Sequence, residues 1–280
     1  MPKPTPFGDR LRSAMQASGP LCVGIDPHPA LLEAWGLDDT AEGVRSFSLR
    51  VVEAMGGVAA IVKPQVALYE RFGSAGFAAL EETLAAAKSA GLLTLADAKR
   101  GDIGSTMAAY ASAWLDDSSS LASDAVTLSP YLGYESLRPA LDLASATGRG
   151  VFVLGLTSNP EGPSVQHVGG ENSVAKSIID QVTKDNAVAE DLGHVGLVVG
   201  ATIGDAPEKL GIDLTASKAP LLTPGLGAQG ATAQDIAKSF ASSYAQVLGT
   251  SSRDILKEGP TVVALREKAL RVRDELLAAG

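Results

Sequence analysis

The chain has little cysteine and no long apolar run, and each shortage excludes a class of protein. Cys22 is the single cysteine among 280 residues, so an internal disulfide or a thiolate metal cluster cannot form. No stretch approaches the roughly 18 uninterrupted apolar residues that a membrane-spanning helix needs, and residues 1–19 lack the apolar centre of a secretory signal. We therefore expect a protein of the reducing cytoplasm, with Cys22 as a small core residue.

Positive charge and histidine are also scarce. The chain has 23 Lys and Arg residues against 32 Asp and Glu residues, a formal net charge of −9, which opposes nonspecific binding to nucleic acid or to anionic membranes. The three histidines, His28, His167 and His194, lie far apart without metal-ligand spacing, and we expect them in loops or at the surface. Any anion-binding site must therefore be a local pocket.

What the chain does contain is a regular series of short apolar runs. They are apolar throughout, as expected of parallel strands that are covered on both faces. The eight predicted strands are residues 21–27, 58–64, 92–98, 125–130, 150–156, 194–202, 219–224 and 245–250. Helical segments are predicted between them at 73–90, 135–146, 171–188 and 231–240, with a closing helix within 261–280. This alternation predicts one (β/α)8 TIM barrel spanning residues 1–280 as a single domain, rather than an open doubly wound sheet.

Polar residues follow most of the predicted strands, at the carboxyl ends where such barrels carry their chemistry. Asp97 and Lys99 are two positions apart and should project to the same side of their strand. Asp26 and Lys63 end the neighbouring strands at about the same height, and Asp102 follows closely. We therefore predict a cluster of alternating charges, although a solvated strand-to-helix loop would also contain such residues.

Such a cluster has a specific chemical use. Flanking carboxylates hold a lysine protonated and aimed at one point, which makes a proton donor. They also repel a third carboxylate by about 4 kcal/mol per pair at ~4 Å and an effective dielectric of 20. This repulsion would destabilise a substrate carboxylate placed there and favour its loss from the substrate.

The motifs that contain these residues occur in the order of a known family. They are "GIDPHP" (24–29), "KPQ" (63–65), "DAKRGDIGST" (97–106), "PYLG" (130–133), "LTSNPEG" (156–162), "TPGLGAQG" (223–230) and "TSSR" (250–253). Together they span nearly the whole chain. The sequence resembles the orotidine 5′-phosphate decarboxylases, in particular their longer bacterial (type 2) branch.

The resemblance implies a role for each matching residue. Lys99 would be the catalytic lysine that protonates C6 of the pyrimidine, beside the signature acid Asp97. Lys63 would complete the charged network, and Asp102 would reach across a dimer interface. The substrate-binding positions it implies are Asp26 and Thr106 for the ribose, Ser158 for the pyrimidine, and Gln229, Arg253 and Pro224 for the phosphate end.

The implied activity is decarboxylation of orotidine 5′-phosphate to uridine 5′-phosphate, the last step of de novo pyrimidine nucleotide synthesis, by a homodimer without metal or organic cofactor.

The predicted phosphate site also has support that is independent of the resemblance. Loops after strands 7 and 8 are the recurring phosphate site of these barrels, small residues let backbone N–H groups approach, and an arginine offers a bidentate fork. We expect the loop after strand 7 and the segment after Ser158 to close over a ligand.

Two other functions remain open at this stage. A Mg²⁺-dependent phosphosugar decarboxylase or synthase barrel would want an acidic ligand where this chain has Lys63, and a cation there repels a divalent metal. A noncatalytic nucleotide-binding barrel has little reason to hold carboxylates beside an anionic ligand.

The individual residues also have structural alternatives. Asp26 could be a helix cap, Lys63 an edge lysine, and Gln229 and Arg253 surface residues. Residues 200–211 depart from the family pattern, so the connection after strand 6 is uncertain.

Overall fold

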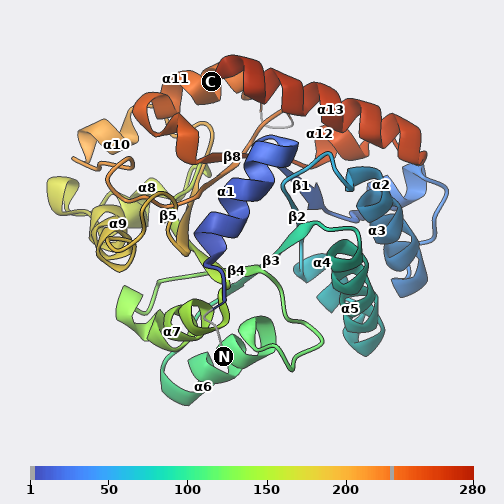
Figure 1. Cartoon of the computed structure of the whole chain (residues 1–280), viewed down its shortest axis with the longest axis horizontal. Coiled ribbons are helices and arrows are strands. Elements are labelled where there is room, and N and C mark those ends of the chain that lie inside the picture. Colours follow the sequence, from blue (N-terminus) through green and yellow to red (C-terminus); the bar gives the residue numbers. More distant parts are fainter. Residues whose placement is uncertain (1–3, 228–229) are drawn as a thin grey trace.

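The computed structural model describes residues 4–227 and 230–280, and its centre is a closed barrel of parallel strands in sequence order (Figure 1). β8 pairs with β1 and closes the barrel. The predicted (β/α)8 fold is confirmed. The strands are β1 (Leu21–Ile25), β2 (Ile61–Pro64), β3 (Leu93–Arg100), β4 (Ala125–Leu128), β5 (Gly150–Leu156), β6 (Val195–Val199), β7 (Leu221–Pro224) and β8 (Val247–Ser251).

Helices surround the barrel (Figure 1). Their apolar faces pack against the strands, so a run such as β6 is buried along its whole length. The α-helices are α1 (Phe7–Ser18), α2 (Pro29–Ala34), α3 (Ala41–Met55), α4 (Ala67–Glu70), α5 (Gly73–Ser89), α6 (Gly104–Leu115), α7 (Arg138–Thr147), α8 (Pro163–Gln166), α9 (Val174–Asp185), α10 (Ala206–Lys209), α11 (Ala233–Phe240), α12 (Arg253–Leu256) and α13 (Val262–Ala279). Short 3₁₀ helices are η1 (Tyr134–Leu137), η2 (Gly170–Asn172) and η3 (Ala241–Gln246).

Helix α1 crosses the middle of the barrel in Figure 1 and covers its amino-terminal end. Phe7, Leu11 and Met15 recur every four residues and form one apolar face. They share a buried cluster with Cys22 and Phe152 from the strands, which confirms Cys22 as a core residue. Our prediction from the sequence did not include this helix, although the four-residue spacing of its apolar side chains is helical.

Two connections differ from the sequence-based expectation. The helix predicted at 171–188 begins only after Ser173, whose side chain accepts a hydrogen bond from the backbone of Lys176 and caps α9. Between β6 and β7 the chain forms turns and the four-residue α10, so this unit lacks the long helix of its neighbours. No helix in the described part of the chain is long and apolar enough to cross a membrane.

Strand register sets the height of the charged residues. Gly24 of β1 pairs with Lys63 of β2, and Gln65 forms a bridge with Asp97. The carboxyl ends of β1, β2 and β3 therefore bring Asp26, Lys63 and Asp97 to one level.

Candidate active site

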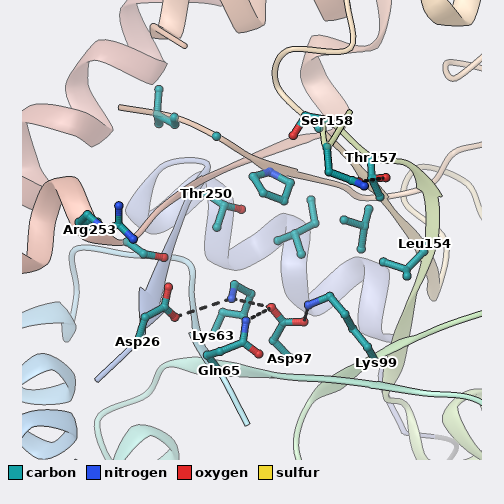
Figure 2. A pocket seen from close by; sticks show the side chains of 18 of the residues that line it. Asp26, Lys63, Gln65, Asp97, Lys99, Leu154, Thr157, Ser158, Thr250 and Arg253 are labelled. Carbon is teal, nitrogen blue, oxygen red and sulfur yellow. Dashed lines mark hydrogen bonds and ion pairs between the residues drawn. The ribbon is translucent and has the colours of Figure 1, made fainter. Parts of the chain in front are cut away.

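A cavity of about 420 Å³ opens at the carboxyl ends of the strands. Seven of the predicted site residues line it, and several are labelled in Figure 2: Asp26, Lys63, Asp97, Lys99, Ser158, Pro224 and Arg253. Leu154, Val198 and Leu222 add apolar surface. A pocket that combines apolar surface with converging polar and charged groups suits a polar small molecule.

Asp97 is the centre of the charged network, and four donors satisfy its carboxylate. Oδ2 accepts from Lys63 Nζ at 2.8 Å and from Gln65 Nε2 at 3.0 Å. Oδ1 accepts from Lys99 Nζ at 2.5 Å and from the Thr127 hydroxyl at 3.0 Å. Because every lone-pair direction is engaged, the carboxylate is fixed in position.

The two lysines differ in their access to the pocket. Lys63 is only 6% exposed and lies between Asp97 and Asp26, with its Nζ 4.0 Å from Asp26 Oδ1. It is therefore a buried network residue and not an edge lysine. The Lys99 side chain is 46% exposed, so its ammonium can also reach a bound molecule. Figure 2 shows these four charges in a row of alternating sign.

Burial disfavours charge at Lys63 and Asp97, yet pairing outweighs burial at both. Desolvation alone would lower the pKa of Lys63, but the charges of Asp97 and Asp26 raise that pKa above its usual value. Desolvation would raise the pKa of Asp97, but Lys63 and Lys99 hold that pKa well below its usual value. Both groups therefore remain ionised at neutral pH.

Lys99 reaches this network through an unusual backbone conformation. Its φ is +47°, in the left-handed region that costs a non-glycine residue about 1–3 kcal/mol. The β3–β4 register shifts between Ala96 and Arg100, so regular strand alternation does not position this side chain. The predicted shared pocket of Asp97 and Lys99 is observed, but a local irregularity brings it about.

Asp26 presents a free acceptor to the pocket. Its Oδ1 is buried without a hydrogen-bond partner in the described part of the chain. The N-cap of the following α2 is His28, and no side chain caps that helix. Asp26 is therefore not a helix cap, and a buried acceptor of this kind requires a hydroxyl or water partner.

The opposite side of the pocket offers groups for an anion. Arg253 is exposed at the start of α12 and faces the pocket in Figure 2. Among the described residues no hydrogen bond or ion pair holds its guanidinium. Gly225 and Gly227 have φ of +122° and +76°, so the loop after β7 needs glycine there. The predicted Gln229 lies outside the described residues.

The segment after β5 forms a second wall. Thr157 and Ser158 line the pocket. Gln166 of α8 holds the start of the segment, because its amide both accepts from the Thr157 backbone N–H at 2.9 Å and donates to the Thr157 hydroxyl at 2.6 Å. Asn159 accepts from the same hydroxyl at 2.7 Å. The predicted pyrimidine contact Ser158 thus belongs to a structured loop.

Two predicted residues do not belong to this pocket within one chain. Asp102 and Thr106 are absent from the described residues that line it. Asp102 Oδ1 accepts a hydrogen bond from the backbone of Ile103 at 2.8 Å, and Thr106 is exposed on α6. The sequence suggested that Asp102 lies near the charged cluster of its own chain. The structure instead places it between β3 and α6, outside the described lining of the pocket.

The structure also reveals pocket residues that the sequence reasoning missed. His28, which we expected in a loop or at the surface, is in a loop but lines the pocket, and Thr250 and Ser252 do so beside it. Their position could have indicated this, because His28 follows β1 by three residues, Thr250 lies near the end of β8 and Ser252 comes directly after it. Within the described residues no group of three or more His, Cys, Asp or Glu side chains is placed to hold a metal ion.

Asp97 is expected to stabilise the fold at neutral pH and to lose that contribution in acid. Folding lowers its pKa from an ordinary value of 3.8, so the contribution is full above that value and fades as the pH falls toward the native pKa. Asp97→Asn should lower the free energy of unfolding by about 3 kcal/mol at pH 7, because it breaks a buried ion pair. Urea denaturation followed by circular dichroism measures this difference.

The difference between parent and Asp97→Asn should then shrink below about pH 4. Asp142→Asn is the matched control, since that carboxylate is 70% exposed and lies 3.9 Å from Arg138. Its effect should stay within about 0.5 kcal/mol. An Asp97→Asn difference of equal size at pH 7 and pH 3 would contradict the assigned charge state.

Comparison with known proteins assigns this barrel and pocket to one family. Residues 19–267 match the model described as the orotidine 5′-phosphate decarboxylase / HUMPS family. A Salinispora tropica protein named orotidine 5′-phosphate decarboxylase is 56% identical over 275 residues, covering 98% of both chains. A Streptomyces coelicolor protein of the same name is 53% identical over 277 residues, also covering 98% of both.

Solved structures agree with this assignment. A Streptomyces avermitilis protein matches with a TM-score of 0.94 and 52% identity, over 99% of this chain and 97% of that one. The Leishmania donovani OMP decarboxylase matches with a TM-score of 0.77 and 28% identity, over 98% and 99%. The resemblance predicted from the motifs is confirmed, and the chain belongs to the orotidine 5′-phosphate decarboxylase / HUMPS family.

Proposed function

We propose that this protein is a carboxy-lyase that converts orotidine 5′-phosphate to uridine 5′-phosphate, the last step of de novo pyrimidine nucleotide synthesis. One observation carries the proposal: Asp97 is held between two lysines, and the more exposed lysine, Lys99, faces an open pocket. The names of the Salinispora and Streptomyces relatives support the same substrate. The scarcity of cysteine is in keeping with a cytoplasmic enzyme.

Substrate binding begins at the phosphate. The guanidinium of Arg253, which no other described residue pairs, suits a phosphate dianion, and the glycines of the loop after β7 allow close backbone approach. Asp26, with its free acceptor, suits a ribose hydroxyl. The pyrimidine would then extend toward Ser158 and Lys99. Binding energy gained at the phosphate offsets the cost of holding the substrate carboxylate beside Asp97.

The chemical step follows from the order of charges. Asp97 repels the substrate carboxylate, which favours cleavage of its bond to C6 and release of CO2. The bonding electron pair remains on C6, where the Lys99 ammonium stabilises the developing carbanion. Lys99 then transfers a proton to C6, forms uridine 5′-phosphate, and regains a proton from solvent. Lys63 keeps Asp97 ionised and fixed throughout.

The metal-dependent alternative within the family fits these residues poorly. A Mg²⁺ site is built from oxygen ligands, and the corresponding position at the end of β2 holds the Lys63 ammonium. The noncatalytic alternative would leave the paired lysines and aspartates without a use. Both alternatives make different experimental predictions.

The test uses purified protein that has been treated with EDTA. Orotidine 5′-phosphate should lose its ultraviolet absorbance rapidly, and chromatography should identify uridine 5′-phosphate as the product. Nucleotide binding without conversion would establish the noncatalytic barrel. Conversion of a phosphosugar only after Mg²⁺ is added would establish the metal-dependent alternative.

We further propose that the protein acts as a homodimer. Three large apolar side chains are exposed on the loops that follow β3 and β4: Ile103 is 62% exposed, Tyr131 82% and Leu132 55%. The backbones of these two loops are in close contact. A Cβ added to Gly101 would lie only 2.3 Å from the Ser129 carbonyl oxygen. Exposed apolar residues grouped in this way favour a protein partner.

This surface borders the residues that one chain leaves out of its own pocket. Asp102 directly precedes Ile103, and Thr106 lies on the first turn of α6. A twofold contact through these loops would let Asp102 and Thr106 of the partner subunit complete each pocket. The dimer would thus be needed for activity.

Ile103→Glu is expected to weaken this dimer by about 100-fold or more, because it buries a charge without a partner. Sedimentation velocity over a concentration series measures the dissociation, and activity should fall as the monomer appears. Val188→Glu is the control, because Val188 is 93% exposed and follows α9, outside these loops. A monomeric parent with full activity would contradict the proposal.

A further inference from the structure

We infer that Thr127 is a positioning residue for the proposed decarboxylation, and the inference rests on that function. Thr127 lies near the carboxyl end of β4 and is fully buried. It is absent from the described residues that line the pocket. Its hydroxyl joins the two groups on which the chemistry depends, Asp97 and Lys99.

The hydroxyl uses both of its hydrogen-bonding capacities on these residues. It donates to Asp97 Oδ1 at 3.0 Å and accepts from the Lys99 backbone N–H at 2.9 Å. One hydroxyl has one proton to donate, so this pairing also fixes its direction. Thr127 therefore connects the carboxylate that holds the Lys99 ammonium to the backbone that bears the Lys99 side chain.

The backbone of Lys99 requires such a restraint. Its φ of +47° is disfavoured for a side chain with a Cβ, and it follows a register shift between β3 and β4. Unfavourable backbone conformations persist only where surrounding contacts determine them. The bond from Thr127 is a contact of this kind, because it ties the Lys99 N–H to the rigid neighbouring strand.

Removal of the hydroxyl would therefore act on the position of the lysine and not on substrate contacts. Lys63 and Gln65 would still bind Asp97 Oδ2, so the carboxylate would stay in the pocket. Lys99 Nζ would lose its fixed height relative to C6 of the pyrimidine. A small displacement of a reacting group slows chemistry while it leaves binding nearly unchanged.

The test compares three variants at this position. Thr127→Val keeps the shape without the hydroxyl and should lower kcat by about 10- to 100-fold, with KM within about twofold of the parent. Thr127→Ala should show the same loss of kcat, which covers the case in which the valine variant does not fold. Thr127→Ser keeps the hydroxyl and should retain kcat within about threefold.

Thr83→Val is the matched control for the loss of a buried hydroxyl. Thr83 is fully buried in α5, where its hydroxyl donates to the Ala79 carbonyl at 2.7 Å, and it is not among the described residues that line the pocket. It should leave kcat unchanged. Equal losses in the serine and valine variants, an unchanged kcat in both hydroxyl-free variants, or a change in KM alone would overturn the role of Thr127. An inactive parent would instead refute the proposed function.

Discussion

Replacement of Lys99 with alanine is expected to lower the turnover of orotidine 5′-phosphate by at least about 10⁴-fold, because it removes both the proton donor and the cation that stabilises the carbanion. No other described ammonium can substitute for it. Lys63 is buried and committed to Asp97 and Asp26, so its proton is not directed at the open pocket. Steady-state rates of product formation measure the loss.

The binding of uridine 5′-phosphate separates catalysis from folding in this variant. Its affinity, measured by calorimetry, should change by less than about tenfold, because the phosphate contacts remain. Lys176→Ala provides the control, since Lys176 forms an exposed i,i+4 pair with Asp180 on α9 that contributes little. Turnover by Lys99→Ala near the parent rate would contradict the mechanism.

Replacement of Arg253 with alanine is expected to lower kcat/KM by about 10²- to 10³-fold, because a truncated charge pair with phosphate costs a corresponding 2.7–4 kcal/mol. The effect should appear mainly in KM, with some loss of kcat, since the phosphate contact also helps to hold the carboxylate near Asp97. Arg253→Lys should be intermediate, because it retains the charge and loses the bidentate fork.

The nucleoside orotidine, which lacks the phosphate, shows whether Arg253 acts where we assign it. The parent should convert orotidine far more slowly than the nucleotide. Arg253→Ala should convert orotidine at nearly the parent's rate, because the missing side chain then has no phosphate to bind. An equal loss of activity on nucleotide and nucleoside would place the effect of Arg253 elsewhere.

The barrel and the charged row could be predicted because both follow from local pattern. Strands buried on both faces are apolar throughout, and the carboxyl ends of such strands converge on one pocket. Asp26, Lys63 and Asp97 stand directly at those ends, so counting strands was enough to bring them together.

The remaining features depend on contacts between distant segments. Thr127 resembles any polar residue near a strand end until the register shift brings its hydroxyl to Lys99. The spacing of Phe7, Leu11 and Met15 is helical, but the packing of α1 over one end of the barrel depends on contacts with distant strands. The relation of Asp102 to the pocket needs a second chain, which no periodicity within one chain can reveal.

A crystal structure with bound uridine 5′-phosphate tests the central claim most directly, because it locates C6 relative to Lys99. The account predicts the phosphate at Arg253, the ribose at Asp26, and Lys99 Nζ within about 3.5 Å of C6, the separation of reacting atoms. A pyrimidine ring that points away from Lys99, with C6 beyond the reach of its ammonium, would contradict the assignment of Lys99 as the proton donor.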